Sequence, residues 1–195
     1  MKSETLLHEV KLITQTGVEF VKKKLSHLAP NQINWKPNSD SWNISEILAH
    51  LNTYTKFYNK AISERLQTTR HTTPTDFFIS SPLGKSAWNG MKLGKQKNIK
   101  RRFKSPKNFN PTYTEGLISE NPVEEYIQLQ NDFLGIVEEA KNFNLRKVKT
   151  GLSISKIVKL RLGDVLLFIA YHNERHIQQI LNLLQNTNFP EKSYE

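Results

Sequence analysis

The stretch GDVLLFIAYHNERHIQQILNLL, residues 163–184, decides the fold of this chain. Its apolar residues recur every three or four positions, which predicts a helix with one buried face. That face carries Val165, Ile169, His172, His176, Ile180 and Leu183. Two histidines therefore lie among aliphatic residues on a helix that must pack against other elements.

Three further segments have the same periodicity and can supply the packing partners: residues 6–30, 43–66 and 121–142. Pro30 closes the first segment. Asn43 and Glu46 have the spacing of a capping box and begin the second, whereas Asn121 and Pro122 stand at the cap and first helical position of the third. Four helices of ~20 residues predict an all-α fold, a four-helix bundle with long crossover connections.

Two long connections separate these helices. Residues 67–120 contain several prolines and glycines and are too long for an ordinary bundle loop, so we expect a crossover there, with a short helix near residues 83–94. Residues 144–162 show no clear period and are interpreted as a second, partly ordered crossover. Such connections imply that the helices do not follow a simple up-down-up-down order. A length of 195 residues predicts a single domain spanning residues 1–195.

The net charge of +10 is concentrated in the long crossover. Nine of its basic residues lie between positions 85 and 107: Lys85, Lys92, Lys95, Lys97, Lys100, Arg101, Arg102, Lys104 and Lys107. The remaining 19 basic residues nearly balance the 18 acidic ones. With Trp88 and Phe103, residues 85–107 could form a surface for nucleic acid or another anion. Because charge patches are unspecific, we weigh a solvated basic loop above a nucleic-acid partner.

The chain contains no cysteine, which excludes disulfides, thiolate metal ligands and a thiol nucleophile of its own. Its N-terminus lacks the apolar core of a signal peptide. No apolar run approaches the ~20 residues that a membrane span requires. We therefore expect a cytoplasmic protein without a membrane partner, in which any metal is held by His, Asp or Glu.

Three histidines are candidate metal ligands. His172 and His176 are four positions apart, so one helix face presents two imidazoles, and His50 lies beside Ile47 and Leu51 on the buried face of the second helix. Each could instead be a core histidine satisfied by a local hydrogen bond. Since one divalent ion would satisfy all three, we predict a shared metal site. The other histidines, which lack this spacing, are expected to be solvated or structural: His8, His27 and His71.

The acidic and amide residues beside these histidines limit the chemistry. Asn173 occupies the glutamate position of the His-Glu-x-x-His motif, which argues against a zinc protease. Glu174 follows His172 by two residues and is expected to face solvent. Glu46 precedes His50 by one turn and could support a metal ligand or act as a base, although its place in the capping box explains it better.

Several of these features together resemble the DinB-like superfamily of four-helix-bundle metalloproteins. The resemblance rests on Trp35, on WNISEILAHL at residues 42–51, on Leu162-Gly163-Asp164, and on FIAYHNERHIQQI at residues 168–180. It implies a divalent metal, zinc or nickel, held by His50, His172 and His176. Residues 67–120 carry little of the resemblance.

The resemblance also implies an activity, because characterised relatives include transferases that use bacillithiol, mycothiol or similar thiols, and a mycothiol-dependent isomerase. The expected function is therefore a metal-dependent transferase with a low-molecular-weight thiol as substrate. Three neutral ligands leave the ion its charge and an open position, where a thiol or water is acidified. A metal-dependent hydrolase and a non-catalytic binding module with a structural metal are the alternatives.

Further residues and a possible partner complete the sequence-based expectations. Four side chains are candidates for pocket polarity: Tyr54, Tyr58, Tyr171 and Arg175. Packing or ion pairing explains each of them better than catalysis, so no catalytic residue is assigned. A homodimer is a further expectation, since bundles with an unused apolar helix face often pair.

Overall fold

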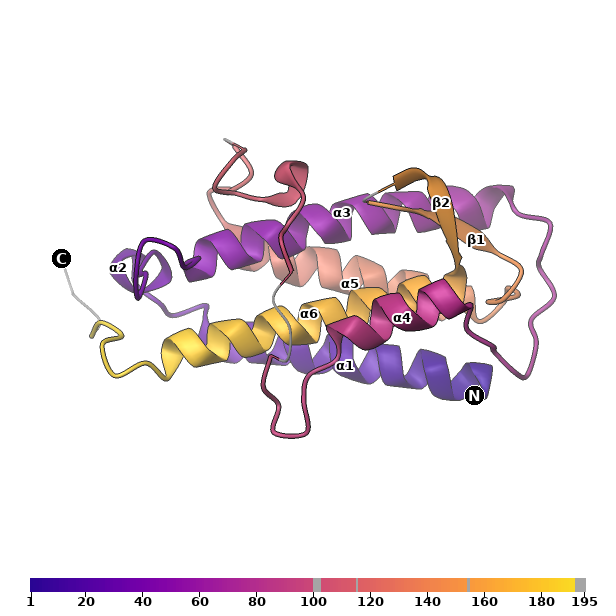
Figure 1. Cartoon of the computed structure of the whole chain (residues 1–195), viewed down its shortest axis with the longest axis horizontal. Helices are drawn as coiled ribbons and strands as arrows, with labels where there is room; N and C mark the ends of the chain where they lie inside the picture. The colour runs from indigo at the N-terminus through magenta and orange to yellow at the C-terminus, as the bar shows by residue number, and fades with distance from the viewer. Residues whose placement is uncertain (100–102, 115, 154, 192–195) are drawn as a thin grey trace.

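Four long helices run along the long axis of the molecule in the computed structural model (Figure 1). They are α1 (Ser3–Lys24), α3 (Ile44–Thr68), α5 (Pro122–Ala140) and α6 (Leu162–Leu184). Helices α1 and α3 each pack against both α5 and α6, so the four helices enclose a common core. The structure describes residues 1–99, 103–114, 116–153 and 155–191, and none of the helices in these ranges is long and apolar enough to cross a membrane. The predicted all-α class is confirmed.

The helix directions explain the long crossover. In Figure 1, α3 and α5 run the same way, whereas α1 and α6 run in the opposite direction. Two parallel helices joined in sequence require a connection that returns along the bundle, and residues 69–121 make this return. The helices therefore do not follow an up-down-up-down order, as the long connections implied. Helices α5 and α6 are antiparallel, so their connection does not need to cross the molecule.

The shorter elements confirm one prediction and correct two. Helix α4 (Pro82–Met91) is the short helix expected near residues 83–94, and a 3₁₀ turn, η1 (Lys107–Phe109), follows it. The first long helix ends at Lys24 rather than at Pro30. Pro30 instead begins the short helix α2 (Pro30–Ile33), because its fixed φ and missing N–H suit the first helical position.

The second correction concerns residues 144–162, which were interpreted as a partly ordered crossover without a clear period. They contain an antiparallel hairpin of β1 (Lys149–Leu152) and β2 (Ser155–Arg161), with an irregularity between Gly151 and Leu152. The opposed residues Thr150 and Leu160 are buried, whereas Ile157 is 90% exposed. Because apolar side chains occur on both faces, the alternation typical of a half-buried strand is hidden in the sequence.

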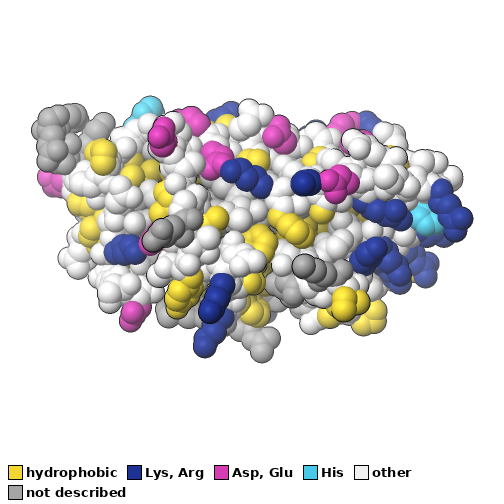
Figure 2. All heavy atoms as spheres, turned by 90° about the horizontal axis from the view of Figure 1, so that it is seen from above, with side chains coloured by type: hydrophobic (Ala, Val, Ile, Leu, Met, Phe, Trp, Pro, Cys, Tyr) yellow, Lys and Arg dark blue, Asp and Glu magenta, His cyan; other side chains and the backbone are white. Residues whose placement is uncertain are grey.

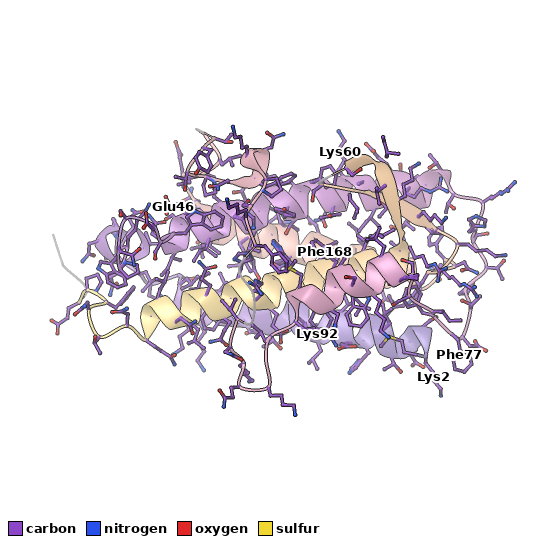
Figure 3. The ribbon with its side chains drawn as sticks, in the orientation of Figure 1. Lys2, Glu46, Lys60, Phe77, Lys92 and Phe168 are labelled. Carbon is purple, nitrogen blue, oxygen red and sulfur yellow. The ribbon has the colours of Figure 1, made fainter. Side chains whose placement is uncertain are left out.

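Both histidine-bearing helices have well-defined starts. At the start of α3, the Asn43 side chain accepts the Glu46 N–H at 2.8 Å, and the Glu46 carboxylate accepts the Asn43 N–H at 2.9 Å. Glu46 also pairs with Lys36 at 2.7 Å. The capping box is therefore confirmed, and Figure 3 shows Glu46 at the start of α3, well away from Phe168 on α6.

The start of α6 explains the Leu162-Gly163-Asp164 motif. A Cβ on Gly163 would lie 2.7 Å from the Phe78 ring, so a larger residue does not fit there. The fully buried Asp164 carboxylate accepts hydrogen bonds from the Ser81 N–H at 3.0 Å and hydroxyl at 2.9 Å. Ser81 in turn caps α4. The motif therefore docks α4 on α6 and places the chain after α4 beside the middle of α6.

Candidate metal centre

Three imidazoles from two helices meet inside the bundle. Helix α3 supplies His50, and α6 supplies His172 and His176. Their ring centroids are 5.1, 4.8 and 4.7 Å apart, and one nitrogen of each ring lies within 4.8 Å of the others. The Nε2 atoms of His50 and His172 are 3.2 Å apart. The structure thus brings together the three residues predicted as ligands, which lie up to 126 positions apart in the sequence.

Hydrogen bonds on the outer edges of two rings determine which nitrogen is free. His50 Nδ1 is 2.6 Å from the Phe109 carbonyl, which can only accept, so this nitrogen carries the proton. His176 Nδ1 is 3.0 Å from Gln179 Oε1, which accepts in the same way. Both rings therefore direct the lone pair of Nε2 toward the centre of the cluster. Carbonyl partners of this kind are typical of metal-binding histidines, because they hold the tautomer and the ring orientation.

Burial keeps all three imidazoles neutral. His50 is 3% exposed and His172 is 7% exposed. Burial lowers the pKa of His50 to about 4, although the hydrogen bond to Phe109 partly opposes this shift. The pKa values of His172 and His176 also lie well below the usual range, first because of burial and then because of neighbouring imidazoles. Neutral imidazole is the form that binds a metal, so these side chains have the protonation state that metal binding needs at neutral pH.

The donor set fits a divalent metal ion. Two nitrogens bound to one tetrahedral zinc at 2.0–2.1 Å would be roughly 3.3 Å apart, which matches the separation of 3.2 Å between His50 and His172 Nε2. Without a cation, at most one of these two atoms can donate to the other, and the inward lone pair of His176 receives no hydrogen bond from the described residues. One ion would satisfy all three nitrogens.

Aromatic side chains enclose the cluster. Phe168 stacks on the His172 ring at 5.7 Å, and its position in α6 is marked in Figure 3. The ring centroid of Tyr54 lies 4.6 Å from that of His172, and the ring centroid of Trp42 lies 5.0 Å from that of His50. Burial raises the pKa of Tyr54 to about 12, so the phenol stays protonated. Trp42 and Phe168 were not predicted to belong to the site, although Phe168 precedes His172 by one helical turn.

The end of the long crossover covers the cluster. Phe109 supplies the carbonyl that binds His50, and the Ser105 hydroxyl lies 3.5 Å from the same Nδ1. The Phe103 ring lies 5.4 Å from the Arg175 guanidinium. Sequence reasoning could not find the Phe109 contact, because a backbone carbonyl has no signature in the sequence. The contact of Gln179 with His176 could have been predicted, since Gln179 follows His176 by three residues on the same helix.

The other candidate side chains have structural partners. The Tyr58 hydroxyl lies 3.2 Å from that of Ser153, and the Tyr171 hydroxyl donates to Glu9. Glu174 is half-buried, which corrects the expectation that it faces solvent. Burial raises its pKa, and Lys92 and Lys97 oppose the shift. His8 and His27 are exposed and His71 is half-buried, and none of the three belongs to the cluster.

The basic crossover offers little support for a stacking surface. Trp88 stacks on Tyr171 at 6.0 Å, and the Lys92 ammonium lies over both rings. Lys100, Arg101 and Arg102 lie outside the described residues.

Figure 2 shows lysine and arginine side chains gathered at one end of the visible face. A surface pocket is lined by eight residues, four of them basic: His71, Thr75, Phe77, Asn144, Arg146, Lys147, Lys149 and Arg161. Basic residues therefore also cluster outside the segment that dominates the sequence.

Comparison with known proteins identifies one family. The family model described as the DinB superfamily matches residues 21–180, which include all three clustered histidines. The matched region extends from the last turn of α1 through most of α6. No curated protein and no solved structure matches the chain significantly.

Proposed function

The chain belongs to the DinB superfamily, and from this premise we propose that it is a metal-dependent transferase that uses a low-molecular-weight thiol. The observation that carries the proposal is the meeting of three buried, neutral imidazoles at one point. A cluster of this kind can bind a cation but cannot itself act as a charged acid at neutral pH. The proposed ligands are His50, His172 and His176, and the proposed ion is zinc or nickel.

A divalent ion held by His50, His172 and His176 would keep its full charge and would lower the pKa of a thiol or water beside it. The chain has no cysteine, so the sulfur nucleophile must come from a cosubstrate. His176 retains more exposed surface than His50 or His172, and this favours approach of a small molecule from its side. In the transfer step the thiolate sulfur forms a bond to the electrophilic carbon of the acceptor. The bond from that carbon to its leaving group breaks, and the thiol proton passes to solvent.

The protein's own residues supply orientation and a low dielectric. The Phe109 carbonyl and Gln179 hold the rings of His50 and His176 with their Nε2 atoms inward. Trp42, Tyr54 and Phe168 pack around the imidazoles and exclude water. Electrostatic stabilisation of a thiolate is stronger in such an environment than in water.

A structural metal is the second candidate. It is favoured by the burial of His50 and His172, which leaves little surface on two of the three ligands. In structural zinc sites the protein supplies every ligand, whereas catalytic sites keep one position for water or substrate. Access of an external ligand to the ion therefore separates the two candidates.

The test combines metal-loaded protein with a panel of small thiols and a chromogenic alkylating acceptor. We expect formation of the S-alkyl product to require both thiol and metal, to be lost in His172→Ala, and to persist in His8→Ala, which alters an exposed histidine. Acceptor cleavage without thiol would instead identify a hydrolase. Absence of turnover at full metal occupancy, with no spectral response of a cobalt-loaded sample to thiols, would support the structural metal.

A further inference from the structure

Arg175 is a buried charge for which the described residues supply a ring contact with Phe103 but no carboxylate. It lies on α6 between His172 and His176 and is 6% exposed. Its buried Nη1 makes no hydrogen bond. None of the ion pairs formed by the described residues involves Arg175.

Such a side chain needs an anion. A guanidinium does not give up its proton in a protein, so it cannot escape the cost of burial by becoming neutral. A buried charge is tolerated when it is paired and hydrogen-bonded. The nearest acid in the sequence, Glu174, does not fill this role, because the cations that act on it are Lys92 and Lys97.

The location of Arg175 connects it to the metal centre. As the residue three positions after His172 and directly before His176, it lies beside both proposed ligands on the same helix. Its positive charge contributes to the lowered pKa values of both histidines. The Phe103 ring lies 5.4 Å from its guanidinium, and the same chain segment continues to Phe109, which contacts His50. Arg175 and the three imidazoles are therefore covered by one segment.

We propose that Arg175 binds a carboxylate of the thiol cosubstrate, so that the site selects small thiols with a carboxylate a few bonds from the sulfur. This inference rests on the proposed function and specifies its substrate class. The planar guanidinium can donate two parallel hydrogen bonds to a carboxylate, which fixes orientation as well as affinity. The metal would hold the sulfur end of the molecule, and Arg175 the carboxylate end.

The test is calorimetric binding to the zinc-loaded full chain, with three probes: 3-mercaptopropionate, its neutral amide 3-mercaptopropionamide, and propionate. We expect the wild type to bind the carboxylate thiol about tenfold or more tightly than the amide, as a charge-assisted hydrogen bond predicts. Arg175→Gln should remove this preference and leave the affinity for the amide unchanged. Arg175→Lys should retain part of the preference, because the positive charge remains but the bidentate hydrogen bonding to the carboxylate is lost.

Lys92→Gln is the matched control. Lys92 is another cation near α6, but it lies over the rings of Trp88 and Tyr171 and pairs with Glu9. The carboxylate preference should persist in this variant. Zinc content and circular dichroism establish that each variant is folded and loaded.

The outcomes separate this inference from the proposed function. If the wild type binds both thiols equally, or if Arg175→Gln keeps the preference, the carboxylate site is wrong although thiol binding stands. If neither thiol binds but propionate binds in an Arg175-dependent manner, the anion site stands and the thiol function is wrong. If none of the probes binds, both are wrong.

Discussion

Helices α3 and α6 contribute to two buried polar clusters that differ in how their hydrogen-bond groups are matched. The imidazole cluster consists of His50, His172 and His176. The amide cluster consists of Thr55, Gln130 and Asn173, and it lies where α5 joins the other two helices. In the imidazole cluster, the Nδ1 atoms of His50 and His176 donate to oxygen atoms outside the cluster. Their Nε2 lone pairs therefore point inward.

The amide cluster, by contrast, contains side-chain donors as well as acceptors, although the buried Gln130 Oε1 makes no hydrogen bond. The fully buried Gln130 donates from Nε2 to Thr55 Oγ1 at 2.9 Å and to Asn173 Oδ1 at 3.3 Å. Asn173 Nδ2 donates to the Ile169 carbonyl, one turn earlier in α6. A buried polar cluster therefore does not by itself indicate a functional site. The informative feature is that nitrogens of three separate rings converge on one point, where a cation can bind.

The largest expected difference between the clusters is their response to metal. Zinc at about a thousand times its dissociation constant should raise the free energy of unfolding by about 4 kcal/mol through linkage. Denaturant unfolding with and without zinc measures this gain. His172→Ala should lose it and Gln130→Leu should keep it. Equal stabilisation by zinc in the wild type and His172→Ala would contradict the proposed site.

The second difference is the response of metal-free protein to acid. The pKa of His50 is lowered from 6.5 to about 4, so between these pH values the unfolded state binds a proton that the folded state does not. This contribution to stability is present above pH 6.5 and is lost as the pH falls toward 4, by about 3 kcal/mol. Urea unfolding across this range should show a steeper decline in the wild type than in His50→Gln.

The amide cluster provides the control for that titration. Amide groups do not ionise in this range, so Gln130→Leu should retain the pH dependence of the wild type. A slope in His50→Gln as steep as that of the wild type would show that His50 is not responsible for the acid sensitivity.

A smaller effect is expected from breaking the amide cluster itself. Gln130→Leu leaves Asn173 Oδ1 without its donor in a buried position, and this should cost about 2 kcal/mol of folding free energy. The midpoint of denaturant unfolding measures the loss. Metal content should be unchanged, and a fall in zinc stoichiometry would mean that the two clusters are coupled through α6.

The smallest effect concerns the start of α3. Asn43→Ala removes the side-chain cap and should lower the free energy of unfolding by about 1 kcal/mol. Thermal unfolding measures this change, and zinc affinity serves as the second readout. Because Glu46 bonds to the cap and to Lys36, we expect zinc affinity to be unaffected. Weaker zinc binding would instead favour the alternative in which Glu46 supports His50 as a metal ligand.

Most of the fold could be predicted because its main signals are local. The apolar positions of α3 and α6 recur with the helical period, and Asn43 with Glu46 marks a start within four residues. The hairpin was missed because its faces are not cleanly divided between apolar and polar residues: Leu160 is buried whereas Ile157 is exposed. The premature end of α1 at Lys24 was missed because a proline after a helix limits its length without fixing its last residue.

The sequence by itself determined which histidines could share an ion, since placing His50, His172 and His176 on buried helical stripes requires only the 3.6-residue period. Only the tertiary structure decided that the stripes of α3 and α6 face each other at the same height, with two Nε2 atoms 3.2 Å apart. It also brought the Phe109 carbonyl to His50 and left Arg175 Nη1 buried without a hydrogen bond. Helical periodicity is a property of neighbouring residues, whereas pairing of a side chain depends on segments that meet only when the chain folds.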